Sequence, residues 1–349
     1  MGRGYSRATT MNVAMLTVGD VTRQTGGYLY HARVYPLLQS MGITIHEVTL
    51  SAATVTAQRT ATVSIDPRRY DVIMVDALAR TAVAPYIETW QHSCPVIAMV
   101  HELPSEAMGV DAADEAPLLR ADMLIVVSPD GRQRLLQRGV PGERIVIAPP
   151  GCDRLGVPPL RAVAQPPQVL CVAQWIPRKG LDTLITAWSL VKSPEAVLHL
   201  YGERDADADY TTQIDALIAA ARRSGAQIVV HGSVPDAHIV AAYQHARLFV
   251  LPSRFEGYGM VFAEALWAGL PVIACDTGPV AALVGTGGML VPVDDVQALA
   301  DAIQHVLADA AAYGVLAQAA AVRGQALPRW QDTATVWHDT LRSVVRTRA

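Results

Sequence analysis

The chain has 349 residues, of which 51% are hydrophobic and 17% charged, and its formal net charge at pH 7 is −4. This apolar composition excludes intrinsic disorder, the length predicts two domains, and the slightly acidic balance excludes a broad nucleic-acid-binding surface. The four cysteines lie far apart without a Cys-x-x-Cys pair. They predict neither a zinc site nor a disulfide framework, and they fit a reducing compartment.

No segment reaches the roughly 18 apolar residues that a membrane-spanning helix needs. The apolar run 11–18 lacks a small-residue cleavage site and ends in Gly19 and Asp20, so it predicts a buried strand rather than a signal peptide. We therefore expect a cytoplasmic protein. Peripheral contact with a membrane stays open.

Short apolar runs alternate with helical patterns through the first half of the chain. They predict strands at 12–18, 44–49, 72–75, 96–100, 123–127 and 145–148. A helix is expected over 28–41, with Pro36 inside it. Turn residues bound the apolar runs on both sides, which is typical of strands covered on both faces in a parallel sheet.

Two proline pairs, Pro158-Pro159 and Pro166-Pro167, predict an interdomain linker, because proline continues neither a helix nor a strand ladder. A second alternating series follows. Its strands are expected at 169–173, 197–201, 228–231, 248–251, 271–274 and 289–291, and its helices at 181–191, 210–224, 236–245, 262–268 and 295–308.

The two series predict an α/β protein of two doubly wound, Rossmann-like domains that face each other across a cleft. We expect the first domain at residues 1–158 and the second at 159–328. Trp330, Trp337 and Leu341 have helical spacing, so a helix over 329–349 is expected to pack back on the first domain. Ligands of such sheets bind at the carboxyl ends of the strands, where we expect the functional residues.

The most informative stretch follows the strand that ends at residue 251. A turn with two glycines leads into a helix, and such a backbone can approach an anionic diphosphate and bind it with unpaired N–H groups. The residues of this predicted binding loop are Gly257, Tyr258, Gly259, Met260 and Val261. Glu256 is placed to accept hydrogen bonds from a sugar, and Glu264 from a ribose. An ordinary strand–turn–helix with two solvated glutamates explains the same spacing.

The pattern Glu256-x7-Glu264, followed by segment 268–274, resembles the C-terminal signature of the retaining glycosyltransferases of family 4, which have the GT-B fold. Further segments that resemble strand-end motifs of this family are Tyr201-Gly202-Glu203, 231–234, 288–292 and 150–153. The resemblance covers residues 11–340. It implies transfer of a hexose from a UDP-, GDP- or ADP-sugar to an acceptor hydroxyl, without an essential metal or another cofactor.

Lys179 follows the first strand of the second domain and is one of two lysines in the chain. A lysine at such a turn can stabilise the charge of a departing diphosphate. The family usually has an arginine five positions earlier, where this chain has Gln174. Gln174 can donate a hydrogen bond but brings no charge. Either the site works with one cation, or the neighbouring Arg178 replaces the missing one.

In the first domain, the family uses a glycine pair in the loop after the first strand, matched here by Gly26 and Gly27. The resemblance implies that this pair brings the backbone near the donor phosphate and the acceptor. It also implies that His101, which follows strand 96–100, touches the transferred sugar or its acceptor. Without the family, a flexible glycine turn explains the glycine pair equally well, and a lone histidine at a strand end is more often structural. The Asp-x-Asp pattern within 205–209 is expected to be a solvated charge run.

Two other functions stay open. A nucleotide-sugar epimerase or hydrolase on the same fold would turn over its donor without an acceptor. A catalytically silent sugar-nucleotide-binding subunit is suggested by Gln174. The expected partners are the nucleotide sugar and a small-molecule, glycan or lipid acceptor, with no nucleic acid. The sequence indicates neither the sugar, the base and the acceptor nor the oligomeric state.

Overall fold

The computed structural model describes residues 10–23, 25–51, 54–107, 109, 111–156 and 163–348. The chain divides into two units, unit 1 with Met1–Pro150 and Trp330–Ala349, and unit 2 with Gly151–Arg329. The sequence had placed these divisions at 158/159 and 328/329. The first half of the predicted linker, residues 157–162, lies outside the described residues.

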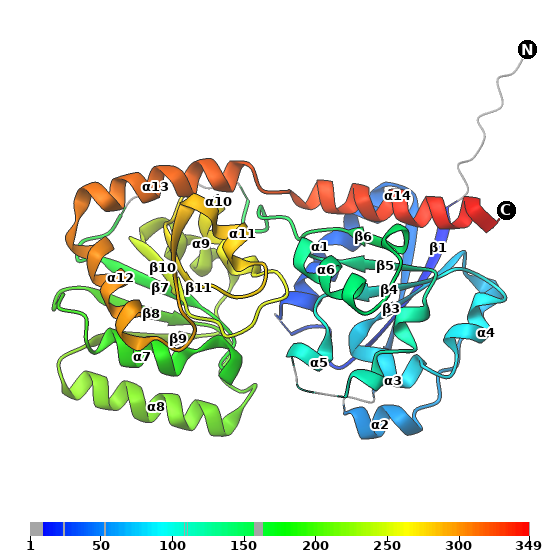
Figure 1. The fold of residues 1–349 in the computed structure, drawn as a ribbon, viewed down its shortest axis with the longest axis horizontal. Coiled ribbons are helices and arrows are strands. Elements are labelled where there is room, and N and C mark those ends of the chain that lie inside the picture. Colours follow the sequence, from blue (N-terminus) through cyan, green and yellow to red (C-terminus); the bar gives the residue numbers. More distant parts are fainter. Residues whose placement is uncertain are drawn as a thin grey trace, which may run out of the picture. The chain divides into compact units, whose positions relative to one another are not determined.

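Unit 1 is built on a parallel sheet with the strand order β2-β1-β3-β4-β5-β6 (Figure 1). Its strands are β1 (Met11–Val18), β2 (Ile43–Leu50), β3 (Val72–Asp76), β4 (Val96–Val100), β5 (Met123–Val126) and β6 (Ile145–Ile147). Its helices are α1 (Gly26–Ser40), α2 (Val55–Thr60), α3 (Arg80–Val83), α4 (Ile87–Gln91), α5 (Pro104–Ala107), α6 (Pro129–Gln137) and α14 (Trp330–Arg348). Every residue of β3 and β4 is buried, as a sheet covered on both faces requires. The six strands predicted for the first domain are confirmed.

The C-terminal helix α14 completes the core of unit 1. Trp330, Ala334, Trp337 and Leu341 form its buried stripe. The Trp337 indole donates a hydrogen bond to the Tyr30 hydroxyl on α1 at 2.8 Å, and that hydroxyl donates to the Ala148 carbonyl after β6 at 2.9 Å. Two segments more than 300 residues apart in the chain therefore share one buried hydrogen-bond chain.

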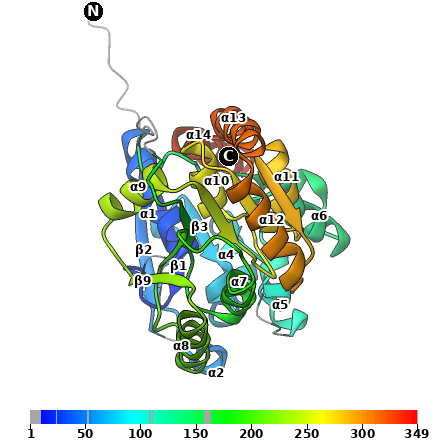
Figure 2. The same ribbon diagram turned by 90° about the vertical axis from the view of Figure 1, so that its left-hand side faces the viewer.

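Unit 2 repeats the architecture with the strand order β12-β11-β10-β7-β8-β9. Its strands are β7 (Gln168–Val172), β8 (Val197–Tyr201), β9 (Gln227–Gly232), β10 (Leu248–Leu251), β11 (Val272–Cys275) and β12 (Gly288–Val291). Its helices are α7 (Leu181–Trp188), α8 (Ala208–Arg223), α9 (Asp236–His245), α10 (Met260–Trp267), α11 (Val280–Val284), α12 (Val296–Ala308) and α13 (Ala310–Gln325). Helix α7 packs against both α8 and α12 (Figure 2). All six predicted strands are confirmed here too, whereas α13 was not predicted.

The sheets bring distant candidate residues together at their carboxyl edges. In unit 1, β3 and β4 are neighbours, with Asp76 beside Met99, so β3 ends next to the residue that follows β4, His101. In unit 2, β7 and β10 are neighbours, so the turns after them also meet. Among the described residues no single helix has the length and hydropathy to cross a membrane. One pair, Val296–Ala308 with Ala310–Thr347, meets these criteria together but is bent by 99°.

Candidate functional site

An ion pair joins the two turns that meet in unit 2. Lys179 ends the 3-10 turn Pro177–Lys179 after β7, and its Nζ lies 2.6 Å from Oε1 of Glu256 in the turn after β10. The Ser253 hydroxyl donates to the same oxygen at 2.6 Å. Burial raises the pKa of Glu256, but Lys179, Arg178 and Ser253 outweigh burial and hold it below its ordinary value. Glu256 is therefore a buried, ionised carboxylate beside a lysine that is 13% exposed.

The backbone of these two turns is in direct contact. Gly180 has φ +66°, and a Cβ at this position would lie 2.2 Å from the Pro252 carbonyl oxygen. The Arg254 N–H donates to the Arg178 carbonyl at 2.7 Å. Only glycine allows the lysine turn to approach the end of β10 this closely.

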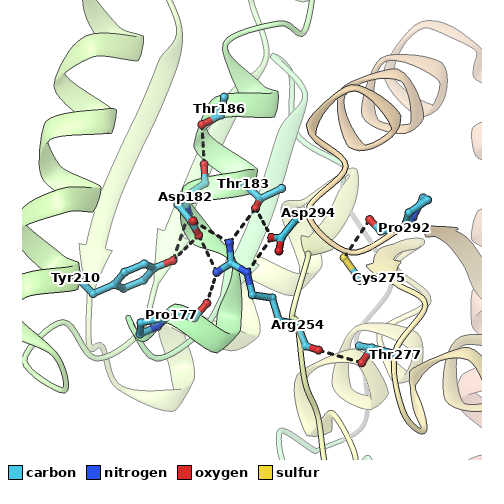
Figure 3. Close-up of polar contacts among 10 residues, drawn as sticks. All are labelled: Pro177, Asp182, Thr183, Thr186, Tyr210, Arg254, Cys275, Thr277, Pro292 and Asp294. Carbon is cyan, nitrogen blue, oxygen red and sulfur yellow. Dashed lines mark hydrogen bonds and ion pairs between the residues drawn. The ribbon is translucent and has the colours of Figure 1, made fainter.

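Arg254 is the centre of a polar cluster that fixes both turns (Figure 3). Its guanidinium lies 2.8 Å from an Asp182 oxygen and 2.8 Å from an Asp294 oxygen, and it also donates to the Pro177 carbonyl. Its own carbonyl accepts a hydrogen bond from Thr277 at 3.0 Å. Arg254 thereby ties the lysine turn to the glutamate turn. Sequence reasoning missed it because Asp182 and Asp294 lie 72 and 40 residues away.

Acid is expected to destabilise unit 2 through two of these carboxylates. Burial raises the pKa of Asp182, but Arg254 and Tyr210 outweigh it, so the pKa values of Asp182 and Glu256 are both lowered in the folded protein. A lowered folded-state pKa gives a stabilisation that is complete above the unfolded values, about 3.9 and 4.3, and is lost as the pH falls through the folded values. Urea unfolding at a series of pH values measures this loss. Glu256→Gln should flatten the acid slope, and an unchanged slope in that variant would contradict the assignment.

Glu264 is buried on α10 and is held by protein groups. Its oxygens lie 2.6 and 3.2 Å from Nε and Nη2 of Arg154, and the Tyr243 hydroxyl donates to it at 3.3 Å. Arg154 also pairs with Asp236 at 2.7 Å. A ribose at Glu264 would have to share this carboxylate with Arg154, a partner that the sequence pattern did not reveal.

The predicted diphosphate loop leads directly into α10. Gly259 precedes the helix with φ +96°, and no side chain caps the helix N-terminus. Its first backbone N–H groups are thus not bonded to a capping side chain. Tyr258 in the same loop is buried, whereas Met260 and Val261 are partly exposed.

Arg178 lies beside the Lys179–Glu256 pair, whereas Gln174 bonds another carboxylate. Arg178 Nη1 lies 3.9 Å from Oε2 of Glu256. The Gln174 amide instead donates to Glu203 after β8 at 2.7 Å. The second positive charge beside this carboxylate is therefore Arg178.

The charge run at 205–209 contains the N-cap residue of α8. The side chain of this residue, Asp207, accepts a hydrogen bond from the Tyr210 N–H.

In unit 1, Gly27 lies near the His101 ring. The glycine pair forms the first two residues of α1 rather than a loop before it, which corrects the prediction. Thr25, the N-cap residue, has an extended backbone, so the helix starts at Gly26. A Cβ on Gly27 would lie 3.5 Å from the His101 ring, which is an ordinary van der Waals contact.

Two further residues, His31 on α1 and Asp76 at the end of β3, complete a buried cluster with His101. His31 Nε2 lies 3.0 Å from Oδ2 of Asp76 and 3.1 Å from Nε2 of His101. Burial and His31 lower the pKa of His101 to about 4, against the opposite effect of Asp76. His101 is therefore neutral at pH 7. Sequence reasoning missed this cluster, although Asp76 ends the strand next to the one that leads to His101.

Known proteins resemble this chain in sequence and in fold. Residues 166–309, within unit 2, match the family model described as glycosyl transferases group 1. A GDP-mannose-dependent alpha-(1-6)-phosphatidylinositol monomannoside mannosyltransferase of Mycolicibacterium smegmatis is 30% identical in an alignment that covers 60% of this chain and 59% of that protein. The chain thus spans less than two thirds of the length of the curated relatives that it matches first.

Two solved structures resemble the whole fold. Sucrose-phosphate synthase from Thermosynechococcus elongatus is similar with a TM-score of 0.79 and 22% identity, over 97% of this chain and all of the other. The Anabaena protein Alr3699/HepE, in complex with UDP-glucose, gives a TM-score of 0.76 and 18% identity over the same shares of the two chains. These two likenesses establish the fold.

Proposed function

We propose that this chain, whose residues 166–309 match the family model of the glycosyl transferases of group 1, transfers a hexose-type sugar from a nucleoside-diphosphate sugar to an acceptor hydroxyl with retention of configuration. The observation that carries the proposal is the Lys179–Glu256 pair beside the uncapped start of α10. It combines positive charge, backbone N–H groups that no side chain caps and a buried carboxylate at one edge of a sheet.

In the proposed reaction, the bond between the sugar C1 and the diphosphate oxygen breaks, and negative charge develops on the departing phosphate. Lys179, Arg178 and the N–H groups of residues 257–261 stabilise that charge. The acceptor hydroxyl attacks C1 on the face that the diphosphate leaves and transfers its proton to a phosphate oxygen. This geometry retains the configuration without a covalent intermediate on the enzyme, and we propose that it requires no metal.

The other residues orient the substrates. Glu256 accepts hydrogen bonds from the sugar. Glu264 accepts hydrogen bonds from the ribose and from Arg154 at the same time. Gln174, held by Glu203, donates to the donor from the turn after β7. In unit 1, Gly26, Gly27 and the neutral His101 are proposed to contact the transferred sugar or its acceptor. We place this enzyme in the cytoplasm, with a small-molecule, glycan or lipid acceptor.

Thermal-shift measurements with UDP-, GDP- and ADP-sugars test the donor, because a ligand that binds the folded state stabilises it by RT ln(1 + [L]/Kd). GDP-mannose and UDP-glucose come first, since they stand in the names of a relative and a structural neighbour. Transfer is then assayed in excess EDTA with glycolipid and sugar acceptors. Full turnover without an acceptor would favour the epimerase or hydrolase, and binding without transfer would favour the silent subunit.

A further inference from the structure

Three atoms with lone pairs converge in unit 1 from three separate elements. His31 Nε2 comes from α1, Asp76 Oδ2 from the end of β3 and His101 Nε2 from the residue after β4. The three separations are 3.0, 3.1 and 3.7 Å. His31 Nε2 faces both other atoms at once, and a single proton on that nitrogen points at only one of them well. One cation between the three atoms would interact with the lone pairs of all of them at once.

The size of this triangle matches a transition-metal ion. A point equidistant from the three atoms lies about 1.9 Å from each within their plane, and it reaches the Zn²⁺ ligand distance of about 2.0–2.1 Å by rising slightly above that plane. Two imidazoles and one carboxylate suit Zn²⁺ and related ions, whereas Mg²⁺ prefers oxygen ligands.

The surroundings hold the three side chains in place before any ion arrives. The Leu78 N–H donates to the other Asp76 oxygen at 2.7 Å, which turns Oδ2 toward the histidines. The Tyr30 ring makes edge contacts with both imidazoles, at 5.9 and 5.0 Å between ring centroids. His31 and Asp76 are buried, and His101, with 18% of its side chain exposed, gives access from solvent. Asp76 thus has the outer-shell hydrogen bond that is usual for a ligating carboxylate, whereas His31 Nδ1 is buried without a partner and its ring is held by packing.

We propose that His31, Asp76 and His101 form a binding site for one divalent transition-metal ion, of the Zn²⁺ class, with its fourth position open to water or another ligand. This site stands on unit 1 alone and does not depend on the proposed transfer reaction. It is compatible with a reaction that proceeds in EDTA, because EDTA removes the ion and leaves the His101 side chain available to the sugar or its acceptor.

Titration of the EDTA-treated, desalted full-length protein with Co²⁺ tests the site. One equivalent is expected to bind with a visible absorption band, which Zn²⁺ abolishes and Mg²⁺ leaves unchanged. His31→Gln and His101→Gln should each weaken Co²⁺ binding by more than the ~10–100-fold typical of losing an outer-shell partner.

The chain offers a matched control in unit 2, where His199 Nδ1 lies 2.9 Å from His231 Nε2 without a carboxylate in the pair. His199→Gln should leave the Co²⁺ band unchanged. Loss of the band in this variant, or its survival in a folded His101→Gln protein, would overturn the proposal. Crystals soaked in Zn²⁺ locate the ion without any substitution. An anomalous peak between His31, Asp76 and His101 supports the site, and its absence there refutes it.

Discussion

Lys179→Ala is expected to lower the turnover of sugar transfer by about 10²–10³-fold, the usual effect of removing one preorganised donor to a developing negative charge. Lys179 is the cation nearest to the buried Glu256, at 2.6 Å, and Arg178 stands farther away, at 3.9 Å. Arg178 therefore cannot take over the position of the ammonium group. Initial rates with saturating donor and acceptor measure the effect.

The chain supplies the control for this experiment. Lys192, the other lysine, is exposed, so Lys192→Ala should keep the wild-type rate and the wild-type affinity for the nucleoside diphosphate. Lys179→Ala leaves Glu256 without its closest cation, so circular dichroism and the thermal transition must show that the variant is folded. A folded Lys179→Ala protein with nearly normal turnover would refute the proposed site.

Trp337→Ala is expected to lower the free energy of unfolding of unit 1 by about 3–5 kcal/mol, the range for truncating a fully buried aromatic side chain. The substitution also removes the hydrogen bond to Tyr30, whose hydroxyl serves the Ala148 carbonyl. Hydrogen exchange read by mass spectrometry separates the two units. Amides of β1 to β6 should exchange faster, while those of β7 to β12 stay protected.

Thr335→Ala provides the control on the same helix, because Thr335 is exposed and its hydroxyl bonds only the Gln331 carbonyl one turn earlier. A surface change of this kind usually alters stability by less than about 0.5 kcal/mol. If Trp337→Ala behaved like Thr335→Ala, α14 would not contribute to the core of unit 1. Equal loss of protection in both units would contradict its assignment to one of them.

The strands could be predicted from the sequence because they are short apolar runs buried on both faces. Val96–Val100 and Leu248–Leu251 begin and end at the expected residues. Helix α13 escaped prediction for the opposite reason, since Ala310–Gln325 is rich in alanine and has no apolar stripe. It packs through small residues, and a Cβ on its Gly324 would lie 2.1 Å from the Leu266 carbonyl oxygen. Such close packing becomes visible only in the folded chain.

The candidate site likewise contains residues that could be predicted from the sequence and residues that could not. Lys179 and Glu256 stand in local patterns, so each could be proposed from its neighbours in the sequence, although not their contact across 77 residues. Arg254, Arg154 and the pair His31 and Asp76 carry no local signal. Their roles depend on partners that the sheet order brings close. Glu264 shows the limit of a local pattern, because its buried partner Arg154 lies 110 residues earlier.

The return of α14 to unit 1 has a consequence for biosynthesis. A ribosome delivers all residues of unit 2 before the Trp337 that covers Tyr30 has been translated. Unit 1 therefore lacks the buried residues of α14 until the end of translation, whereas all residues of unit 2 are already present. A truncated mRNA that ends before codon 330 would yield a chain with all of unit 2 but with a unit 1 that lacks α14. We expect chaperones to bind this truncated chain more than the full-length protein.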